Sequence, residues 1–525
     1  MAMTDTRPAP QGTTAAPTMA LPSDPPGLAG WLSTSDHKRI GRLWIATSLL
    51  FLLLGTVMVA LLGAEGTKGG IDLFKGHRSY AQASTLQAEV LVLLFLLPML
   101  LGLATAIVPL QVGSAEIAFP RGSATAYWLY LVSSGIYVGA YLGDGGYAGG
   151  TSRAVDLWLL SLLGVTVALT IGLVSVLTTV LGLRAPGMTL LRTPAFAWSV
   201  LVGGSLVLLS IPVLAARLIE MYVAHHFGGH LTGYGTISWF WSVPSVYLLT
   251  VPAAGVALEI VPVLTRNRVR LHAAGLAVIG LLGVVGLGMW AQVPATFDDL
   301  LYVAIGLAAV LPPLALLGLL GDTMRNGRPV FKAPLLFAFG TVLLLLLGAI
   351  AGALRVIEPL HLGGTTWETG QTHLLVLGAG TLGGLGALWY WAPKLFGVEL
   401  SEGAAVLAFL VTLGGSLLLA VPELVNGLVN DLRVGTTSFT DHESSIKALN
   451  GVSAAGAVLL TLGALIVVLT LLASARRRSA ASVADDPWGG HTLEWTTASP
   501  PVPANFTAPV APVLSATPLL DEVTA

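Results

Sequence analysis

The stretch VLVLLFLLPMLLGLATAIVPL, residues 90–110, decides the fold, because it runs without a single charged side chain. A helix that spans a bilayer needs about 20 predominantly apolar residues. Comparable uncharged stretches recur along the 525 residues, of which 54% are hydrophobic and 10% are charged. A soluble domain usually carries about 25% charged residues. The sequence therefore predicts an all-α integral membrane protein.

Twelve stretches are long and apolar enough to be predicted as transmembrane helices. They cover residues 41–63, 89–110, 125–142, 157–183, 196–219, 237–264, 272–292, 300–320, 333–354, 371–392, 403–420 and 452–474. The segments around them predict three parts, which are a disordered tail over 1–30, a twelve-helix membrane domain over 31–475, and a Pro-rich tail over 476–525.

Charge and cysteine content limit the topology and the partners. Lys and Arg are more frequent in the loops on the N-terminal side, for example at Arg266, Arg268 and Arg270. The positive-inside rule therefore predicts a multi-pass protein of the cell membrane with both termini in the cytoplasm. The net charge of -2 says nothing about nucleic acid, but the sequence has no basic stripe or binding motif for it, so we expect lipid and no nucleic acid as partners. The absence of cysteine excludes disulfides and thiolate-bound copper.

Several short motifs resemble subunit I of the haem-copper oxidase family in their order and spacing. They are WLSTSDHKRIG (31–41), VPLQVG (108–113), EIAFPR (116–121), WFWSVPSVY (239–247), WYWAPK (389–394) and DPWGGHTLEW (486–495). The resemblance covers nearly the whole chain. It implies a bundle of twelve transmembrane helices like that of cytochrome c oxidase subunit I, in a bacterial inner membrane. It also implies subunit II-like and subunit III-like membrane proteins as partners.

The same resemblance identifies the positions of the redox-centre ligands. Family members hold a low-spin haem between a histidine of the second span and one of the tenth, and these positions are Gln87 and His373 here. Gln371 stands at the position of the active-site haem ligand. Val243 stands at a copper ligand and offers no lone pair to a metal. We therefore expect no copper and no haem, with His373 as the one candidate axial ligand should haem bind.

The proton-carrying residues of the family are also reduced. Ser245 stands where the family has a glutamate, whereas Glu116 keeps a carboxylate at the position of an entrance aspartate. Tyr247 persists, but the histidine to which it would be cross-linked is Val243. The arginine pair that binds haem propionates is reduced to Arg433.

Four polar residues have both a functional and a structural interpretation. His373 is either a haem ligand or a buried histidine bonded to a neighbouring helix. An ionisable group inside a span is costly and hence a functional candidate, but Glu89 could also lie near the interface or be protonated. Glu116 is either a proton-path residue or a solvated loop acid. Glu259 is either a proton carrier or the partner of a neighbouring helix.

Three functions follow from these observations. The first is a non-catalytic structural or assembly subunit of a respiratory-type complex, which has lost most redox-centre ligands. The second is a working haem-copper terminal oxidase subunit that transfers electrons to oxygen and pumps protons. The third is a transporter that uses the emptied haem cavity, with Glu89 or Glu259 binding protons. The sequence leaves open whether the chain is an enzyme.

Overall fold

The computed structural model describes residues 27–67, 73–74, 76–242, 246–290, 299–429, 444–477 and 483–521. The chain divides into two units. The first, Met1–Thr34, contains the short helix α1 (Leu28–Leu32), and the second, Ser35–Ala525, contains the long helices. The described residues form helices and loops, with one isolated bridge between Val502 and Asn505. The predicted all-α fold class is confirmed.

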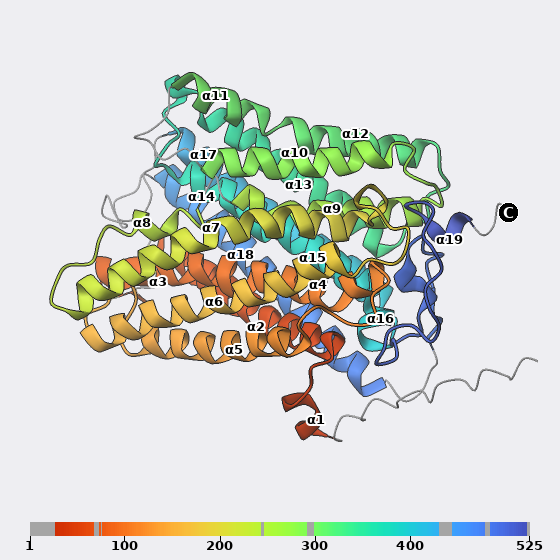
Figure 1. Ribbon diagram of the computed structural model, residues 1–525. Helices are drawn as coiled ribbons and strands as arrows, with labels where there is room; N and C mark the ends of the chain where they lie inside the picture. Colours follow the sequence, from red (N-terminus) through yellow and green to blue (C-terminus); the bar gives the residue numbers. More distant parts are fainter. Residues whose placement is uncertain are drawn as a thin grey trace, which may run out of the picture. The chain divides into compact units, whose positions relative to one another are not determined.

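The long helices of the second unit run side by side as a bundle, as Figure 1 shows. In chain order they are α2 (His37–Glu65), α3 (His77–Glu89), the π-helix η1 (Val90–Leu96), α4 (Leu97–Gln111), α5 (Pro120–Leu142), α6 (Ser152–Gly182), α7 (Ala195–His226), α9 (Val246–Leu264), α10 (His272–Trp290), α11 (Asp299–Ala308), α12 (Leu311–Arg325), α13 (Ala333–Arg355), α14 (Thr366–His373), the π-helix η4 (Leu374–Gly380), α15 (Thr381–Tyr390), α17 (Glu402–Leu428) and α18 (Ser444–Arg477). The short elements are η2 (Leu190–Arg192), α8 (Gly235–Ser238), η3 (Glu358–Leu360), α16 (Ala392–Phe396), η5 (Leu493–Thr496) and α19 (Pro518–Asp521).

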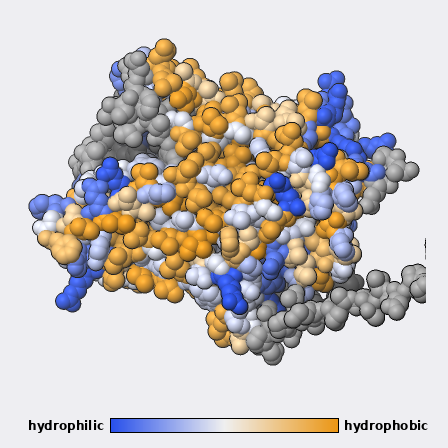
Figure 2. Space-filling model, in the orientation of Figure 1, coloured by the Kyte–Doolittle hydropathy of each residue, from blue (hydrophilic) through white to orange (hydrophobic). Residues whose placement is uncertain are grey.

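The helices have the length and polarity of membrane spans. Among the described residues, 10 helices or helix runs are long and apolar enough to cross a membrane, and they coincide with predicted spans. The two other predicted spans, 125–142 and 272–292, form α5 and α10, although residues 291–292 lie outside the described part. Figure 2 shows apolar side chains across the middle of the bundle and hydrophilic ones toward both ends. The chain is a multi-pass membrane protein.

The C-terminal segment, residues 483–521, packs on one end of the bundle, which we call the tail end (dark blue in Figure 1). Trp488 Nε1 donates to the carbonyl oxygen of Tyr390 at the end of α15, at 2.9 Å. Lys38 Nζ, at the start of α2, donates to Asn505 Oδ1 at 2.9 Å. The helix α3 begins at His77, at the opposite end of the bundle, which we call the far end.

Two helix runs occupy the centre of the bundle, α3–η1–α4 and α14–η4–α15. Their most apolar stretches are 100% and 94% buried inside the protein. The run α3–η1–α4 lies directly against α2, where small residues allow the backbones to meet. A Cβ added at Gly41 would lie 2.6 Å from the Gly102 carbonyl oxygen, so this contact requires glycine.

Candidate functional site

Both central helix runs change from α- to π-helix at the same depth. The π-helix η1 directly follows Glu89, and η4 directly follows His373. A π-helical turn is rare and occurs mostly at functional sites. At this level Gln87 Nε2 lies 3.3 Å from His373 Nε2. The two positions that the resemblance pairs across a haem therefore face each other.

His373 is held by a carboxylate from a third helix. Its Nδ1 lies 2.7 Å from Glu423 Oε2 on α17, and Glu423 Oε1 accepts a hydrogen bond from Ser453 on α18 at 3.4 Å. A carboxylate on one ring nitrogen is the usual support of a metal-binding histidine. On the other nitrogen, however, the amide of Gln87 is in direct contact. Two nitrogen ligands on opposite sides of one metal ion lie about 4 Å apart, because each bond from metal to nitrogen is roughly 2 Å long. The 3.3 Å between Gln87 Nε2 and His373 Nε2 is shorter than this separation.

Glu89 forms the centre of a buried polar cluster near the far end of the bundle. Its Oε2 accepts hydrogen bonds from Tyr137 at 2.7 Å and Trp158 at 3.0 Å, and more weakly from Tyr141 at 3.4 Å. Its Oε1 accepts one from Tyr234 at 2.9 Å. Glu89 is 0% exposed, so it is not an acid at the interface. Four neutral donors from α5, α6 and the start of α8 satisfy both carboxylate oxygens.

Gln371 fills the position of the family's active-site haem ligand. Its Nε2 donates to Tyr247 Oη at 2.7 Å and to the Gly348 carbonyl oxygen at 3.3 Å, and Tyr247 Oη donates to the same carbonyl at 2.8 Å. A Cβ added at Gly352 would meet Tyr247 Oη at 2.2 Å, so these helices are tightly packed. The structure therefore places an amide and a phenol in contact here. Gln371 Oε1 is buried without a partner among the described residues.

A buried ion pair lies one turn away. Arg355 Nη1 on α13 is 3.0 Å from Glu368 Oε1 on α14, and both side chains are less than a tenth exposed. Neither residue was singled out from the sequence, because both lie between two predicted spans. Val243, Ser245 and Arg433, on which part of the ligand argument depends, lie outside the described residues.

The two other candidate acids lie at the tail end. Glu116 is exposed in the loop between α4 and α5, where its backbone carbonyl accepts a hydrogen bond from Ser114 at 2.6 Å. Glu259 is buried on α9, and its Oε2 accepts from the Phe196 backbone N–H at 3.2 Å. Phe196 lies in the first turn of α7, where the helix dipole favours a carboxylate. Glu259 thus caps a neighbouring helix.

No group of three or more His, Cys, Asp or Glu side chains that could hold a metal ion occurs among the described residues. The nearest approach is on α6 and α7, where His225 Nδ1 and His226 Nδ1 lie 2.8 and 2.9 Å from the two carboxylate oxygens of Asp156.

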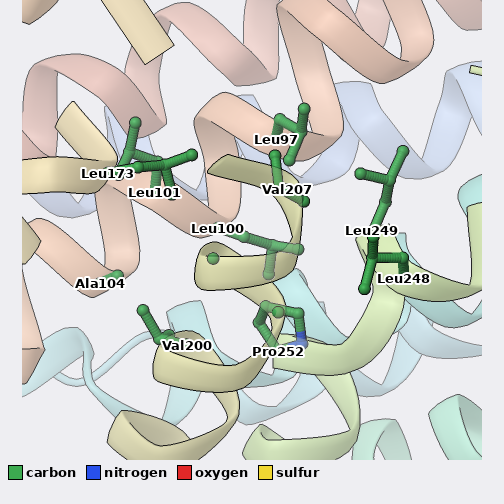
Figure 3. A pocket seen from close by; sticks show the side chains of 12 residues that line it. Leu97, Leu100, Leu101, Ala104, Leu173, Val200, Val207, Leu248, Leu249 and Pro252 are labelled. Atoms are coloured by element: carbon green, nitrogen blue, oxygen red, sulfur yellow. The ribbon is translucent and has the colours of Figure 1, made fainter. Parts of the chain in front are cut away.

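The pocket shown in Figure 3 is apolar and small. It has a volume of about 30 Å³ and lies among α4, α6, α7 and α9. Its lining side chains include Leu97, Leu101, Val207, Leu249 and Pro252. A volume of about 30 Å³ corresponds to roughly one water molecule. This pocket is therefore a packing gap without a polar group to orient a ligand.

Sequence comparison identifies relatives along almost the entire chain. The model of the family "Cytochrome C and Quinol oxidase polypeptide I" matches residues 39–459. A "Probable cytochrome c oxidase subunit 1-beta" of Nocardia farcinica is 30% identical, over 90% of this chain and 85% of the relative. A "Putative cytochrome c oxidase subunit 1-beta" of Streptomyces coelicolor is 31% identical, over 92% and 88%.

A solved structure supports the fold independently. The cryo-EM structure of a heme-copper terminal oxidase dimer aligns with a TM-score of 0.67, over 92% of both chains and at 16% sequence identity. The twelve-helix arrangement implied by the sequence motifs is thus the arrangement of a haem-copper oxidase.

These matches correct one expectation from the sequence. We expected no haem and no copper, but haem and copper are the normal cofactors of the family whose model matches the chain, so that expectation is wrong. The expectation rested on the histidines missing from the ligand positions and not on the cofactors that are normal for the family. The chain belongs to the cytochrome c and quinol oxidase polypeptide I family, the subunit I family of haem-copper oxidases.

Proposed function

We propose that this chain is a structural or assembly subunit of a respiratory-type membrane complex and does not itself reduce oxygen. The observation that carries the proposal is the contact of Gln371 with Tyr247 and the Gly348 carbonyl. Oxygen reduction in this family needs an iron with an open position that faces copper. The amide nitrogen of Gln371 donates both of its hydrogens to protein oxygens and offers no lone pair to iron, and the unpartnered Oε1 is a neutral amide oxygen rather than the imidazole nitrogen of the family's ligand.

The described residues fit the family's cofactors only in part. His373 would hold a haem iron through Nε2, because the carboxylate of Glu423 pairs with Nδ1 and orients the ring. The opposing residue is the amide of Gln87 at 3.3 Å. For the active-site iron and copper, the described residues provide no matching set of imidazoles. We therefore derive no step of oxygen chemistry, and a haem held by His373 is compatible with the proposed role.

Subunit I of haem-copper oxidases typically sits in a complex with other subunits. We propose subunit II-like and subunit III-like membrane proteins as the partners of this chain. The alignment over 85–88% of the relatives' length supports this, because a chain that keeps nearly all of the bundle keeps most of its outer surface. The arginines of the tail-end loops support a cytoplasmic location for both termini, in a bacterial inner membrane.

The test is oxygen uptake by the complex purified from native membranes with a tag on this chain. The proposal predicts that membrane partners co-purify and that uptake with a reduced electron donor equals the rate without protein. A preparation of the Streptomyces coelicolor relative, made in the same way, serves as the control for a competent assay. Sustained uptake by the tagged complex, in proportion to its amount, would overturn the proposal.

One observation favours a second candidate, a working terminal oxidase. Relatives at 30–31% identity over about nine-tenths of the chain are named as oxidase subunits. The same uptake measurement separates the two candidates. A substitution Gln371→Ala that leaves the rate of an active preparation unchanged would also show that position 371 plays no part in it.

A further inference from the structure

The C-terminal segment inserts a carboxyl group into the tail end of the bundle. Glu494, in η5, is 0% exposed. Its Oε1 accepts hydrogen bonds from Gln111 Nε2 at 3.1 Å and Trp391 Nε1 at 3.2 Å. Its Oε2 is buried and has no hydrogen-bond partner among the described residues. An unsatisfied buried polar group costs about 1–3 kcal/mol, and more when it is charged.

Three further buried polar atoms without a described partner belong to residues that contact Glu494, adjoin it in sequence or pack against its neighbour. They are Gln111 Oε1, Tyr390 Oη and Trp495 Nε1. Gln111 bonds to Glu494 directly, and the rings of Tyr390 and Trp495 lie 5.1 Å apart. The set mixes donors with acceptors, which suits water better than a cation, since a cation needs acceptors only. Buried waters typically bridge such groups with about three hydrogen bonds each.

A second buried carboxyl group lies beside the first. Glu259 Oε1 accepts a hydrogen bond from Thr492 Oγ1 at 3.2 Å, and Thr492 directly precedes η5, two residues before Glu494. Among the described residues, neither carboxyl group forms an ion pair with Lys, Arg or His. Two neighbouring buried carboxyl groups without a cationic partner cannot both ionise readily, which favours a state in which one of them carries a proton.

A cavity connects this site with more exposed residues. It has a volume of about 200 Å³, and Glu259, Thr492, His491, His272 and Arg268 are among its lining residues. Arg268 is partly exposed where it pairs with Asp521 at 3.1 Å. At about 30 Å³ per water molecule, the cavity has room for several waters. The cavity therefore offers space for water as far as Glu259 and Thr492, although Glu494 is not among its lining residues.

Among the described residues, the charged and titratable groups near the pair form no ion pair with either carboxyl group. Lys394 on α16 donates to the Thr497 carbonyl oxygen and lies 5.4 Å from the centre of the Trp495 ring. The other titratable groups nearby are Tyr390 on α15, and Arg268, His272 and His491 beside the cavity, while Asp485 and Asp486 act on Lys394. Burial raises the pKa of Glu494, in agreement with the geometry.

We propose that Glu259 and Glu494 form a water-bridged proton-binding site, which shares one proton and is closed by the C-terminal segment. The site's ligands are a proton and ordered water. It is independent of the redox centre, since it involves neither His373 nor Gln371. It would persist if the chain proved to reduce oxygen.

The test is infrared spectroscopy of the full complex in the carbonyl-stretch region of protonated carboxyl groups, in H₂O and in D₂O near neutral pH. Glu494→Gln and Glu259→Gln should each remove the band of one carboxyl group, and the double variant should remove no more than either single variant. Glu116→Gln, at an exposed loop acid, is the control and should leave the band unchanged.

Two outcomes would overturn the proposal. One is a double variant that loses twice the intensity of each single variant, which means two independent acids. The other is a single variant that leaves the band intact. If a variant fails to assemble, a high-resolution map of the unaltered complex decides instead. Water density within hydrogen-bonding distance of Glu494 Oε2 is expected, and a dry, closed contact there contradicts the proposal.

Discussion

The two regions with buried carboxyl groups differ in how the carboxyl oxygens are hydrogen-bonded. Around Glu89, four neutral side-chain donors satisfy both oxygens of the carboxylate. Around Glu494, only one oxygen is satisfied by protein groups, and other buried polar atoms nearby also lack described partners. A carboxylate enclosed by fixed protein donors is held rigidly. One that depends on water can exchange its proton, so the two regions should respond differently to mutation and pH.

The largest expected effect is at Glu89. Glu89→Ala leaves the donors of Tyr137, Trp158 and Tyr234 unsatisfied in the interior, at a cost of about 1–3 kcal/mol for each. The free energy of unfolding should therefore fall by several kcal/mol, and Glu89→Gln, which keeps an acceptor oxygen, should lose less. Thermal unfolding of the purified protein in detergent measures both. If Glu89→Ala were as stable as the exposed-site variant Glu116→Ala, the cluster would have no structural role.

The docking of the C-terminal segment should depend on pH through His491. Burial, assisted by the charge of Arg268, lowers the pKa of His491 to about 4. The docked segment therefore favours neutral His491, and the docking free energy due to this shift is lost as pH falls from about 6.5 to about 4. At 1.36 kcal/mol per pKa unit, the loss is at most about 3 kcal/mol. After correction for the intrinsic slowing of amide exchange in acid, the protection of residues 486–500 should therefore fall with pH more steeply in the unaltered chain than in a variant without His491.

The variant His491→Asn isolates this contribution. Protonation of Glu494 has the opposite sign, because its raised pKa strengthens docking as pH falls. The variant keeps the effect of Glu494 and lacks that of His491, so its segment should become less exchangeable in acid than that of the unaltered chain. Identical pH profiles would show that His491 is not buried in the docked segment.

Lys394 should have a moderate effect on the same segment. Lys394→Ala removes the hydrogen bond to the Thr497 carbonyl and the contact with the Trp495 ring, worth together about 1–3 kcal/mol of docking. Limited proteolysis near neutral pH should therefore cut the C-terminal segment faster. Lys332→Ala, at an exposed lysine, is the matched control. Equal cleavage rates in the two variants would refute a role of Lys394 in docking.

The smallest effect is expected at the far-end surface. Arg78 and Asp144 form an ion pair at 2.6 Å, but both side chains are about half exposed. Exposed pairs contribute about 0.2–1 kcal/mol. Arg78→Ala should lower the free energy of unfolding by no more than this, and high salt should reduce the difference further. If Arg78→Ala lowered the free energy of unfolding as much as Glu89→Ala, the exposure of a side chain would not predict how much its interactions stabilise the protein.

Hydropathy alone located the apolar part of each long helix, because the apolar stretches that a bilayer requires are long, but several helix ends differ by seven to twelve residues, as at α17 (Glu402–Leu428), predicted over 403–420. The predicted span 157–183, for example, is α6 (Ser152–Gly182). The predicted span 300–320 is interrupted between α11 and α12, just before Pro312 and Pro313. Proline lacks the N–H of an i→i−4 hydrogen bond, so the break is explained by residues that the sequence analysis had not considered.

The candidate site was predictable only where a motif pointed to it. The resemblance placed Gln87 opposite His373, and the structure brings them together. Glu423 and Glu494 were not singled out, although Glu494 lies within a quoted motif. Their partners are 50 and 383 residues away in sequence, and a single sequence does not reveal which distant residues meet. Polar residues at the ends of apolar helices, such as Glu423, were the one available signal.

The most direct test of the central claim, that position 371 provides no ligand for an oxygen-binding iron, is carbon monoxide binding. An iron with an open coordination position binds carbon monoxide when reduced, and a six-coordinate one does not. The account predicts that the chemically reduced complex of the variant His373→Ala, which removes the one other candidate haem ligand, shows no change in its visible spectrum when carbon monoxide is added. A carbon monoxide difference spectrum in proportion to the amount of this chain would contradict it.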